Sequence, residues 1–209
     1  MRPGWLLAAL LLLAGCTLGS DDSLIAVSDM PAQMAGHYEL YTEVPVEMPA
    51  DPETKMVCLD ASSMPAIPNT RVRYCAFPAE EDRGGTPRFL DIAPSGKAFA
   101  IRDPERESLS GDEKELRFLG LGEGMYLVQF HEGSRFDLWI ARMSGIGIEL
   151  YALGCDDFPK GTRPYHPYGG TFGPPCSAIS LEALRPGLDA FGAGIKAGRK
   201  APFAILKRL

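Results

Sequence analysis

The sequence predicts an α+β fold that is mostly β, with an antiparallel sheet curled into a half-barrel or sandwich and one C-terminal helix. Short segments rich in β-branched and aromatic residues recur between residues 37 and 153, as expected for strands. Many of the links between them are short and contain glycine, which favours antiparallel neighbours. Apolar residues at helical spacing begin at residue 181, near the C-terminus.

The first half of the domain alternates strand-like segments with proline-rich ones. A strand is expected at residues 37–41. Residues 44–70 are dense in proline, which excludes a continuous helix and predicts an irregular loop. A strand follows at residues 70–77. Residues 88–92 and 97–101 flank Ala-Pro-Ser-Gly and are expected to form a hairpin, because this turn supplies the backbone angles that a tight reversal requires.

The second half predicts a meander followed by a helix and a last strand. The meander strands share short glycine-bearing links and lie at residues 115–119, 125–131, 135–143 and 147–153. Ser180 can cap a helix that begins at Leu181. Pro186 is expected to split or kink this helix, because proline lacks the backbone N–H that the helix interior uses. Residues 203–206 predict the last strand.

The first sixteen residues carry the most specific pattern in the chain. Arg2 precedes an apolar run at residues 5–13, which is shorter than the ~20 residues a membrane-spanning helix needs and typical of a signal peptide. The run ends in Leu13-Ala14-Gly15-Cys16, with two small residues directly before the cysteine. This pattern resembles the lipobox of bacterial lipoprotein signal peptides.

That resemblance implies cleavage before Cys16 and a diacylglyceryl group on its thiol, which anchors the chain to a membrane. Thr17 does not match the Asp that marks retention at the inner membrane, so the resemblance implies the periplasmic face of the outer membrane. We therefore expect a signal peptide at residues 1–15, a lipidated flexible tether at 16–35 and a single globular domain at 36–209. Residues 17–35 are mostly small, polar or acidic, as is typical of a tether.

Four further cysteines predict disulfides rather than a metal site. An even number of cysteines in an exported chain indicates disulfide bonding, because the periplasm is oxidising. The pairs Cys58–Cys75 and Cys155–Cys176 close the shortest loops, which costs the least chain entropy, although two other connectivities remain open. The spacing lacks the C-x-x-C pairs of zinc sites, so no metal is predicted.

Composition and motifs argue against several classes of function. The formal net charge of −6 disfavours nucleic acid as a partner, since nucleic acids attract clustered lysine and arginine. The serine-hydrolase elbow G-x-S-x-G is absent, and no cofactor motif is found. His37 shares a strand face with Glu39, but this pair is an incomplete ligand set, and His37 and His131 are interpreted as strand-end residues. The sequence therefore predicts no enzyme and no cofactor.

A proline- and glycine-rich loop after residue 156 holds the candidate recognition residues. Its aromatic side chains and its histidine have no strand to pack from, and they are Tyr165, His166, Tyr168 and Phe172. Aromatic residues on such a loop anchor recognition surfaces, or they close the end of the sheet as a lid. His166 near Asp156 or Asp157 is a weak candidate for a general base or a metal ligand.

These observations rank three functions. The first is a non-enzymatic envelope lipoprotein that binds a protein partner or supports envelope integrity. The second is a lipocalin-like carrier or sensor of a small apolar ligand, whose cavity would be lined by inward residues such as Phe89, Phe99, Tyr126 and Trp139. The third, an inhibitor of a cell-wall hydrolase, rests on analogy of size and compartment alone.

Overall fold

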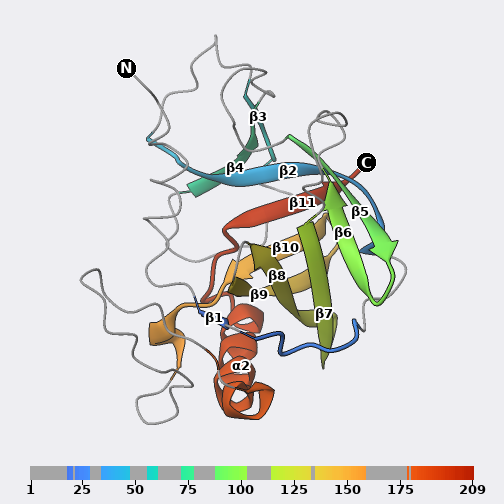
Figure 1. Ribbon diagram of the computed structural model, residues 1–209. Coiled ribbons are helices and arrows are strands. Elements are labelled where there is room, and N and C mark those ends of the chain that lie inside the picture. The colour runs from blue at the N-terminus through green and yellow to red at the C-terminus, as the bar shows by residue number, and fades with distance from the viewer. Residues whose placement is uncertain are drawn as a thin grey trace, which may run out of the picture.

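In the computed structural model the sheet closes into an eight-stranded antiparallel barrel (Figure 1). The structure describes residues 18–20, 22–28, 34–47, 56–60, 72–77, 88–102, 114–132, 135–158, 178 and 180–209. The barrel strands are β2 (Gly36–Pro45), β5 (Phe89–Ser95), β6 (Ala98–Arg102), β7 (Lys114–Gly122), β8 (Met125–Glu132), β9 (Arg135–Ser144), β10 (Gly147–Ala152) and β11 (Ala204–Arg208). The expected mostly β domain with a C-terminal helix is confirmed, and its sheet closes where a half-barrel or sandwich was expected.

Closure depends on the last strand of the chain. From β5 to β10, consecutive strands pair with one another, as the glycine-bearing links predicted. β11 then pairs with β10 on one edge and with β2 on the other, in register from Ala204 opposite Thr42 to Arg208 opposite Tyr38. The first part of β2 pairs with β5 on its other edge, from Gly36 opposite Ile92. Because every barrel strand has two neighbours, the barrel has no open edge.

β2 continues beyond its pairing with β5, and its second half pairs with a small two-stranded extension. Pro45 to Thr42 pair with β4 (Val72–Ala76), and β4 pairs with the two-residue strand β3 (Val57–Cys58). This β3–β4 extension lies at the top of the molecule in Figure 1. The Cys58–Cys75 disulfide, with an S–S distance of 2.06 Å, joins two residues that face each other in the register. The expected irregular loop at residues 44–70 thus contains a short strand.

The barrel interior is filled by side chains from every barrel strand. An eight-stranded barrel is just wide enough for its inward side chains to fill it. The buried residues that meet there are Tyr38, Leu90, Ile92, Phe99, Leu116, Phe118, Val128, Phe130, Ala141, Ile148 and Leu206, joined by Met34 at residue 34 before β2. The Tyr38 hydroxyl donates to the Met34 carbonyl at 2.7 Å, which satisfies the polar end of this buried ring.

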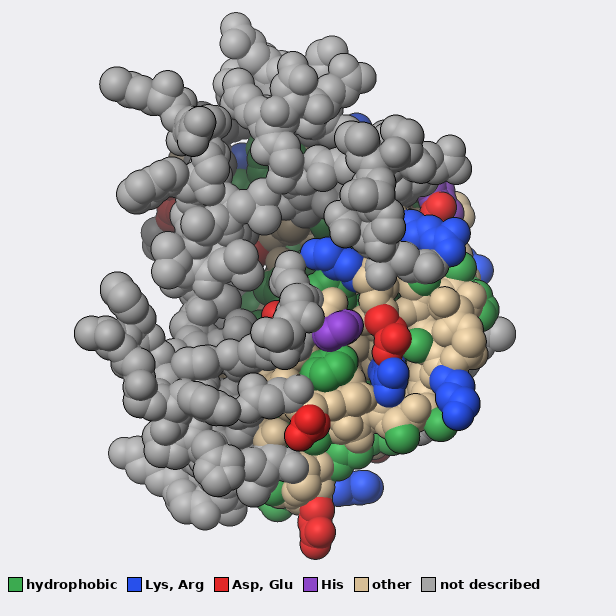
Figure 2. Space-filling model, viewed as in Figure 1, with side chains coloured by type: hydrophobic (Ala, Val, Ile, Leu, Met, Phe, Trp, Pro, Cys, Tyr) green, Lys and Arg blue, Asp and Glu red, His purple; other side chains and the backbone are tan. Residues whose placement is uncertain are grey.

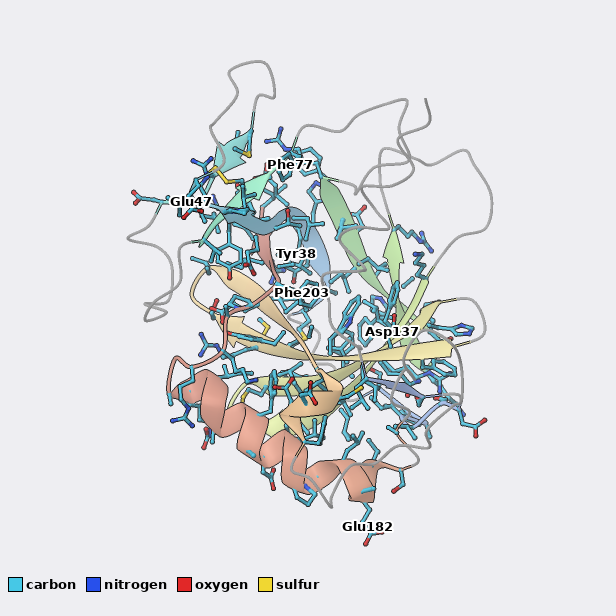
Figure 3. The ribbon with its side chains drawn as sticks, turned by 90° about the vertical axis from the view of Figure 1, so that its left-hand side faces the viewer. Tyr38, Glu47, Phe77, Asp137, Glu182 and Phe203 are labelled. Atoms are coloured by element: carbon cyan, nitrogen blue, oxygen red, sulfur yellow. A yellow bond between two sulfur atoms is a disulfide. The ribbon has the colours of Figure 1, made fainter. Side chains whose placement is uncertain are left out.

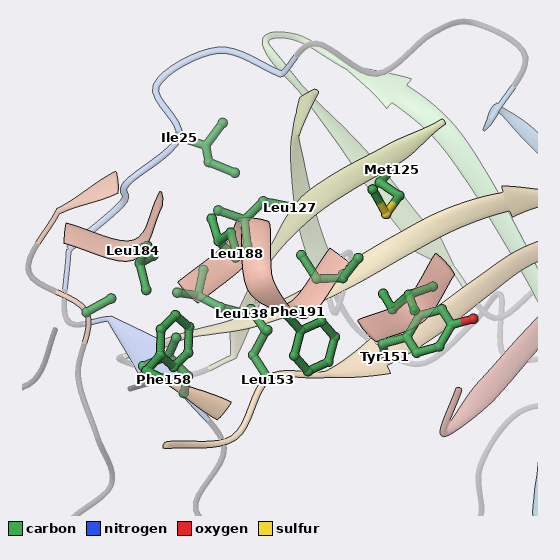
Figure 4. Close-up of a cluster of buried hydrophobic side chains, with 14 residues drawn as sticks. Ile25, Met125, Leu127, Leu138, Tyr151, Leu153, Phe158, Leu184, Leu188 and Phe191 are labelled. Carbon is green, nitrogen blue, oxygen red and sulfur yellow. The ribbon is translucent and has the colours of Figure 1, made fainter. Parts of the chain in front are cut away.

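A second core lies outside the barrel, beneath the helix α2 (Leu181–Lys196) (Figure 4). The helix sets its apolar stripe against outward side chains of β8, β9 and β10, because alternate residues of those strands point away from the barrel interior. The helix contributes Leu184, Leu188, Phe191 and Ile195. Among the described residues, no helix combines the length and the apolar character that crossing a bilayer requires.

The helix starts where predicted and does not stop at its proline. The Ser180 hydroxyl accepts a hydrogen bond from the Ala183 N–H at 3.1 Å, as an N-terminal cap does. Of the two effects expected of Pro186, a split does not occur, because a single helix runs through Pro186 to Lys196. Pro186 lies one and a half turns from the start on the exposed side, where water can satisfy the carbonyl of Glu182 that loses its helical partner.

Residues 16–35 were expected to form a flexible tether, but the described part of this segment packs against the barrel. β1 (Gly19–Ser20) pairs with β9. Leu18 and Ile25 are buried in the core beneath α2, and Met34 is buried in the barrel interior. These apolar residues follow no strand or helix period among their small and acidic neighbours. Composition therefore predicted a tether where the chain packs against the barrel.

A glycine in the β9–β10 turn provides a sharp test of the closure. Gly147 has a φ of +143°, and a Cβ there would approach the Leu206 carbonyl oxygen of β11 to 2.0 Å. We expect Gly147→Ala to lower the free energy of unfolding by about 2 kcal/mol, through backbone strain and this clash. Urea denaturation followed by circular dichroism measures it.

Gly145→Ala in the same turn is the matched control. A Cβ at Gly145 meets no heavy atom within 4 Å, so this variant should unfold at nearly the parent urea concentration. Equal stability of the two variants would mean that β11 does not pass so close to Gly147.

Candidate functional site

A buried polar layer covers the outside of the barrel around β11. The sequence Glu-Leu-Tyr occurs on both strands that flank β11, as Glu39-Leu40-Tyr41 on β2 and Glu149-Leu150-Tyr151 on β10. In both copies the leucine packs against the barrel interior. Because side chains alternate along a strand, each glutamate and tyrosine points to the outer face. We call the two sets the β2 Glu–Tyr pair and the β10 Glu–Tyr pair.

Each glutamate is bound by its tyrosine and by an arginine from elsewhere. The Tyr41 hydroxyl donates to Glu39 Oε2 at 2.6 Å, and Arg88 Nε donates to Glu39 Oε1 at 2.7 Å. The second set has the same pattern. The Tyr151 hydroxyl donates to Glu149 Oε2 at 2.6 Å, and Arg142 donates to the same oxygen at 2.8 Å.

Burial makes these contacts necessary. Glu149 is only 1 % exposed and Glu39 only 7 % exposed, and a carboxylate taken out of water is costly unless it is paired and hydrogen-bonded. Burial alone would raise the pKa of Glu39, but the hydrogen bonds from Tyr41 and Arg88 and the charge of Arg88 outweigh burial and lower the pKa. The carboxylate of Glu39 is therefore held in its charged form.

The tyrosines of the layer are held in their neutral form. Burial and the hydrogen bond to Glu39 raise the pKa of Tyr41 to about 12. Burial and the hydrogen bond to Glu149 raise the pKa of Tyr151 as well. Burial, followed by the charges of Glu43 and Glu149, raises the pKa of Tyr74 on β4, whose hydroxyl donates to the Pro202 carbonyl at 2.5 Å. Such tyrosines donate hydrogen bonds and do not act as bases at neutral pH.

The layer also bonds neighbouring strands to one another. The β10 pair takes its arginine from β9, and the β2 pair takes its arginine from the residue before β5. Between them, Ile205 of β11 is fully buried with Tyr41, Tyr74 and Ala76. The hydrogen bonds of these glutamates and tyrosines are made within the fold, and they join β10 to β9 and β2 to the start of β5.

Of the histidines weighed as site residues, His37 and His131 lie in the described part of the chain, and each stacks on a phenylalanine ring. His37 Nδ1 contacts Asp91 Oδ1, and its ring stacks on Phe89 with centroids 5.8 Å apart. Glu39 is held by Arg88 instead, so His37 and Glu39 do not act as a ligand pair. The His131 ring stacks on Phe136. No group of three or more His, Cys, Asp or Glu residues in the described part of the chain is arranged to hold a metal ion.

Several sequence-predicted site residues lie outside the described residues. These are Cys16, Tyr165, His166, Tyr168, Phe172 and Cys176. Cys155, in the short 3-10 helix η5 (Cys155–Asp157), is disulfide-bonded. Asp157, one of the two carboxylates weighed as a partner of His166, forms an ion pair with Lys200 and accepts the Gly154 N–H at 2.8 Å.

The residues expected to line a ligand cavity divide between the two faces. Phe99, Tyr126 and Trp139 pack with the barrel interior, as predicted. Phe89 points outward, since it stacks on His37 and carries the Arg88 guanidinium 5.2 Å above its ring. The register explains this, because Phe89 alternates with the inward Leu90.

A shallow groove runs between α2 and the β7–β8 turn. It has a volume of about 200 Å³ and is lined by Leu121, Met125, Leu188, Asp189, Gly192, Ala193 and Lys196. Pockets for small molecules usually measure ≈ 300–1,000 Å³, so this groove is too small for such a ligand.

The β3–β4 extension presents exposed apolar side chains. Val57 is 46 % exposed and Phe77 is 41 % exposed. Val57 pairs with Ala76 and precedes the disulfide-bonded Cys58, and Phe77, labelled in Figure 3, directly follows β4. On the face drawn in Figure 2, acidic and basic side chains of the described residues are interspersed, without a patch of one sign there.

Comparisons with protein-family models, with curated proteins and with solved structures find no match for this chain. No residue role is therefore carried over from a relative.

The β10 Glu–Tyr pair predicts a large cost when its cation is removed. Arg142→Met leaves Glu149 buried without a counter-charge, and we expect a loss of at least about 3 kcal/mol of unfolding free energy. Adding Glu149→Met and Tyr151→Phe should recover most of the loss, because the buried charge and its polar partner are then gone. Chemical denaturation measures both.

Lys196→Met is the matched control, since Lys196 pairs with Glu123 on the exposed surface and such pairs contribute at most about 1 kcal/mol. If Arg142→Met cost no more than this control, Glu149 would not depend on Arg142.

The raised tyrosine pKa values predict alkaline destabilisation. Tyrosine ionises near pH 10 when unfolded, whereas Tyr41 ionises near pH 12 in the fold. Between these values the unfolded state binds fewer protons, so stability falls as the pH rises from 10 towards 12. Ultraviolet absorbance of tyrosinate should therefore rise in step with unfolding measured by circular dichroism.

Tyr41→Phe should weaken this pH dependence, since it removes one of the titrating groups. Complete tyrosine ionisation in a chain that is still folded would contradict the burial of the layer.

Proposed function

We propose that this chain is a non-enzymatic lipoprotein of the bacterial envelope, anchored through lipid on Cys16 and facing the periplasm, most consistently at the outer membrane. Its barrel serves as a rigid platform that binds a protein partner or supports envelope integrity. The observation that carries the proposal is Leu13-Ala14-Gly15-Cys16 at the end of an apolar run. Lipid alone can anchor such a chain, because two or more acyl chains hold a protein stably on a membrane.

The internal use of polar groups supports a non-enzymatic role. Within the described residues, Glu39 and Glu149 are both bound by an arginine and a tyrosine. Asp157 is engaged by Lys200, and His37 by Asp91. A general acid or base needs a free position towards its substrate, and these groups are committed to the fold.

The carrier function stands second. An eight-stranded barrel can hold one small ligand, which favours this alternative in principle. Here, however, Phe99, Phe118 and Phe130 share the interior with inward residues of every other barrel strand. A ligand would have to displace them at the cost of their packing. Nothing on the described surface favours a cell-wall hydrolase over other protein partners.

The β3–β4 extension is where we place the partner. Val57 and Phe77 are exposed there beside the disulfide that joins the two strands. A rigid edge with an aromatic anchor suits protein recognition, because little side-chain freedom is lost on binding. The formal net charge of −6 suits a protein partner better than it suits nucleic acid.

The anchor is tested with Cys16→Ser in the full chain. We expect the parent chain in the membrane fraction, with an N-terminal peptide that begins at Cys16 and carries acyl mass. The variant should lack the acyl mass and should no longer be found in the membrane fraction, because the lipid has no sulfur atom to which it can be attached. Mass spectrometry and fractionation of intact cells decide, and a parent peptide without acyl mass would contradict the anchor.

The same cells test the partner. A photo-crosslinking residue at position 77 should give a discrete adduct with an envelope protein, whereas one at exposed Ser95, in the β5–β6 turn, should not. Equal crosslinking at both positions would contradict placement of the partner on the β3–β4 extension.

A further inference from the structure

The chain joins the barrel almost immediately after the proposed lipid site. The Leu18 N–H donates to the Leu153 carbonyl at 2.8 Å, and the Leu138 N–H donates to the Leu18 carbonyl at 3.0 Å. Leu18 is therefore inserted where β9 and the chain after β10 diverge. Its side chain is fully buried in the core beneath α2. Ala178 adds a third bond, from its N–H to the Gly19 carbonyl at 2.7 Å.

The described residues that follow stay against the barrel. We call residues 18–28, as far as they are described, the N-terminal belt. The side chain of Gln129, which is itself buried, accepts from the Leu24 N–H at 2.7 Å and from the Ile25 N–H at 3.2 Å. Arg117 donates to the Ile25 carbonyl at 2.8 Å, and the Ser28 N–H donates to the Lys97 carbonyl. The belt is thus bound to β8, to β7 and, at Ser28, to the β5–β6 turn.

These contacts limit how far the lipid can lie from the barrel. Two residues of extended chain reach at most about 7 Å, so the Cα of Cys16 lies within that distance of the Cα of Leu18. A free tether over residues 17–35 would instead have a typical span of about 24 Å. The domain cannot move away from its anchor as a tethered domain would.

We propose that the barrel lies directly on the lipid headgroups, with the side where Leu18 enters between β9 and β10 turned towards the bilayer. The occupant of this side is thus a lipid surface, reached through the lipid on Cys16. The proposal rests on the lipid anchor proposed above, and it adds a fixed orientation to that anchor.

The topology identifies which residues lie near the bilayer and which lie far from it. Asp156 is exposed and follows Leu153 by three residues, so it lies near the entry point of Leu18. β5 is four strands from β9 in either direction around the barrel. The β5–β6 turn therefore lies across the barrel from β9. Ser95 in that turn is therefore distant, and in Figure 1 β1 and the β5–β6 hairpin lie on opposite sides.

The test uses the lipidated full chain in vesicles of phosphatidylethanolamine and phosphatidylglycerol. A fluorescent amino acid is placed at position 156 or at position 95, and a quencher is placed at the headgroups. We expect several-fold stronger quenching at position 156. A flexible Gly/Ser insertion of about 18 residues between Thr17 and Leu18 is the control, since it restores the reach of a free tether and should remove the difference.

The outcomes separate this inference from the proposed anchor. Absence of acyl mass together with absence of vesicle binding overturns both. Two outcomes overturn this inference alone, provided that the chain carries acyl mass and binds the vesicles. One is equal quenching at positions 156 and 95, and the other is a difference in quenching that the insertion does not remove. Hydrogen exchange gives a second readout, because the amides of Leu18 and Leu138 should be protected in the lipidated chain, and rapid exchange of both would also overturn it.

Discussion

The structure depends on one pairing, that of the C-terminal strand β11 with both β10 and β2. This pairing joins the two ends of the meander and removes the exposed edges that β10 and β2 would otherwise present. It also places the Glu-Leu-Tyr copies of β2 and β10 on either side of Ile205. The filled interior follows from this closure, and so does the position of the two glutamate–tyrosine pairs on the strands that flank β11.

The buried charges of the layer add specificity more clearly than they add stability. A buried ion pair regains roughly the desolvation energy that it costs, so Glu149 with Arg142 is not a large net gain. A slip of one residue, however, would turn Glu149 into the barrel interior and away from its arginine. The two ion pairs therefore penalise wrong registers of β10 against β9, through Glu149 and Arg142, and of β2 against β5, through Glu39 and Arg88.

The sequence predicted elements whose cause is local and missed those whose cause is distant. Short glycine links predicted the meander from β7 to β10, and the Ser180 cap predicted the start of α2. Pro186 misled because its position on the exposed side of the helix is tertiary information. The strand alternation places Glu39 and Glu149 on the face opposite to the inward leucines. The arginines that bind them, Arg88 and Arg142, are seen in the structure. The recognition residues predicted around His166 fall outside the described residues.

The N-terminal belt also constrains the order of events in maturation. Two residues separate the Gly15–Cys16 bond from Leu18, which is buried with both backbone groups bonded to the barrel. An enzyme that acylates the Cys16 thiol or cuts before it needs this stretch of chain clear of the fold. Under the anchor proposed above, the belt therefore docks after processing. That is consistent with a closure made by β11 and not by the belt, which adds only the two-residue strand β1 to the part of β9 that β10 does not reach.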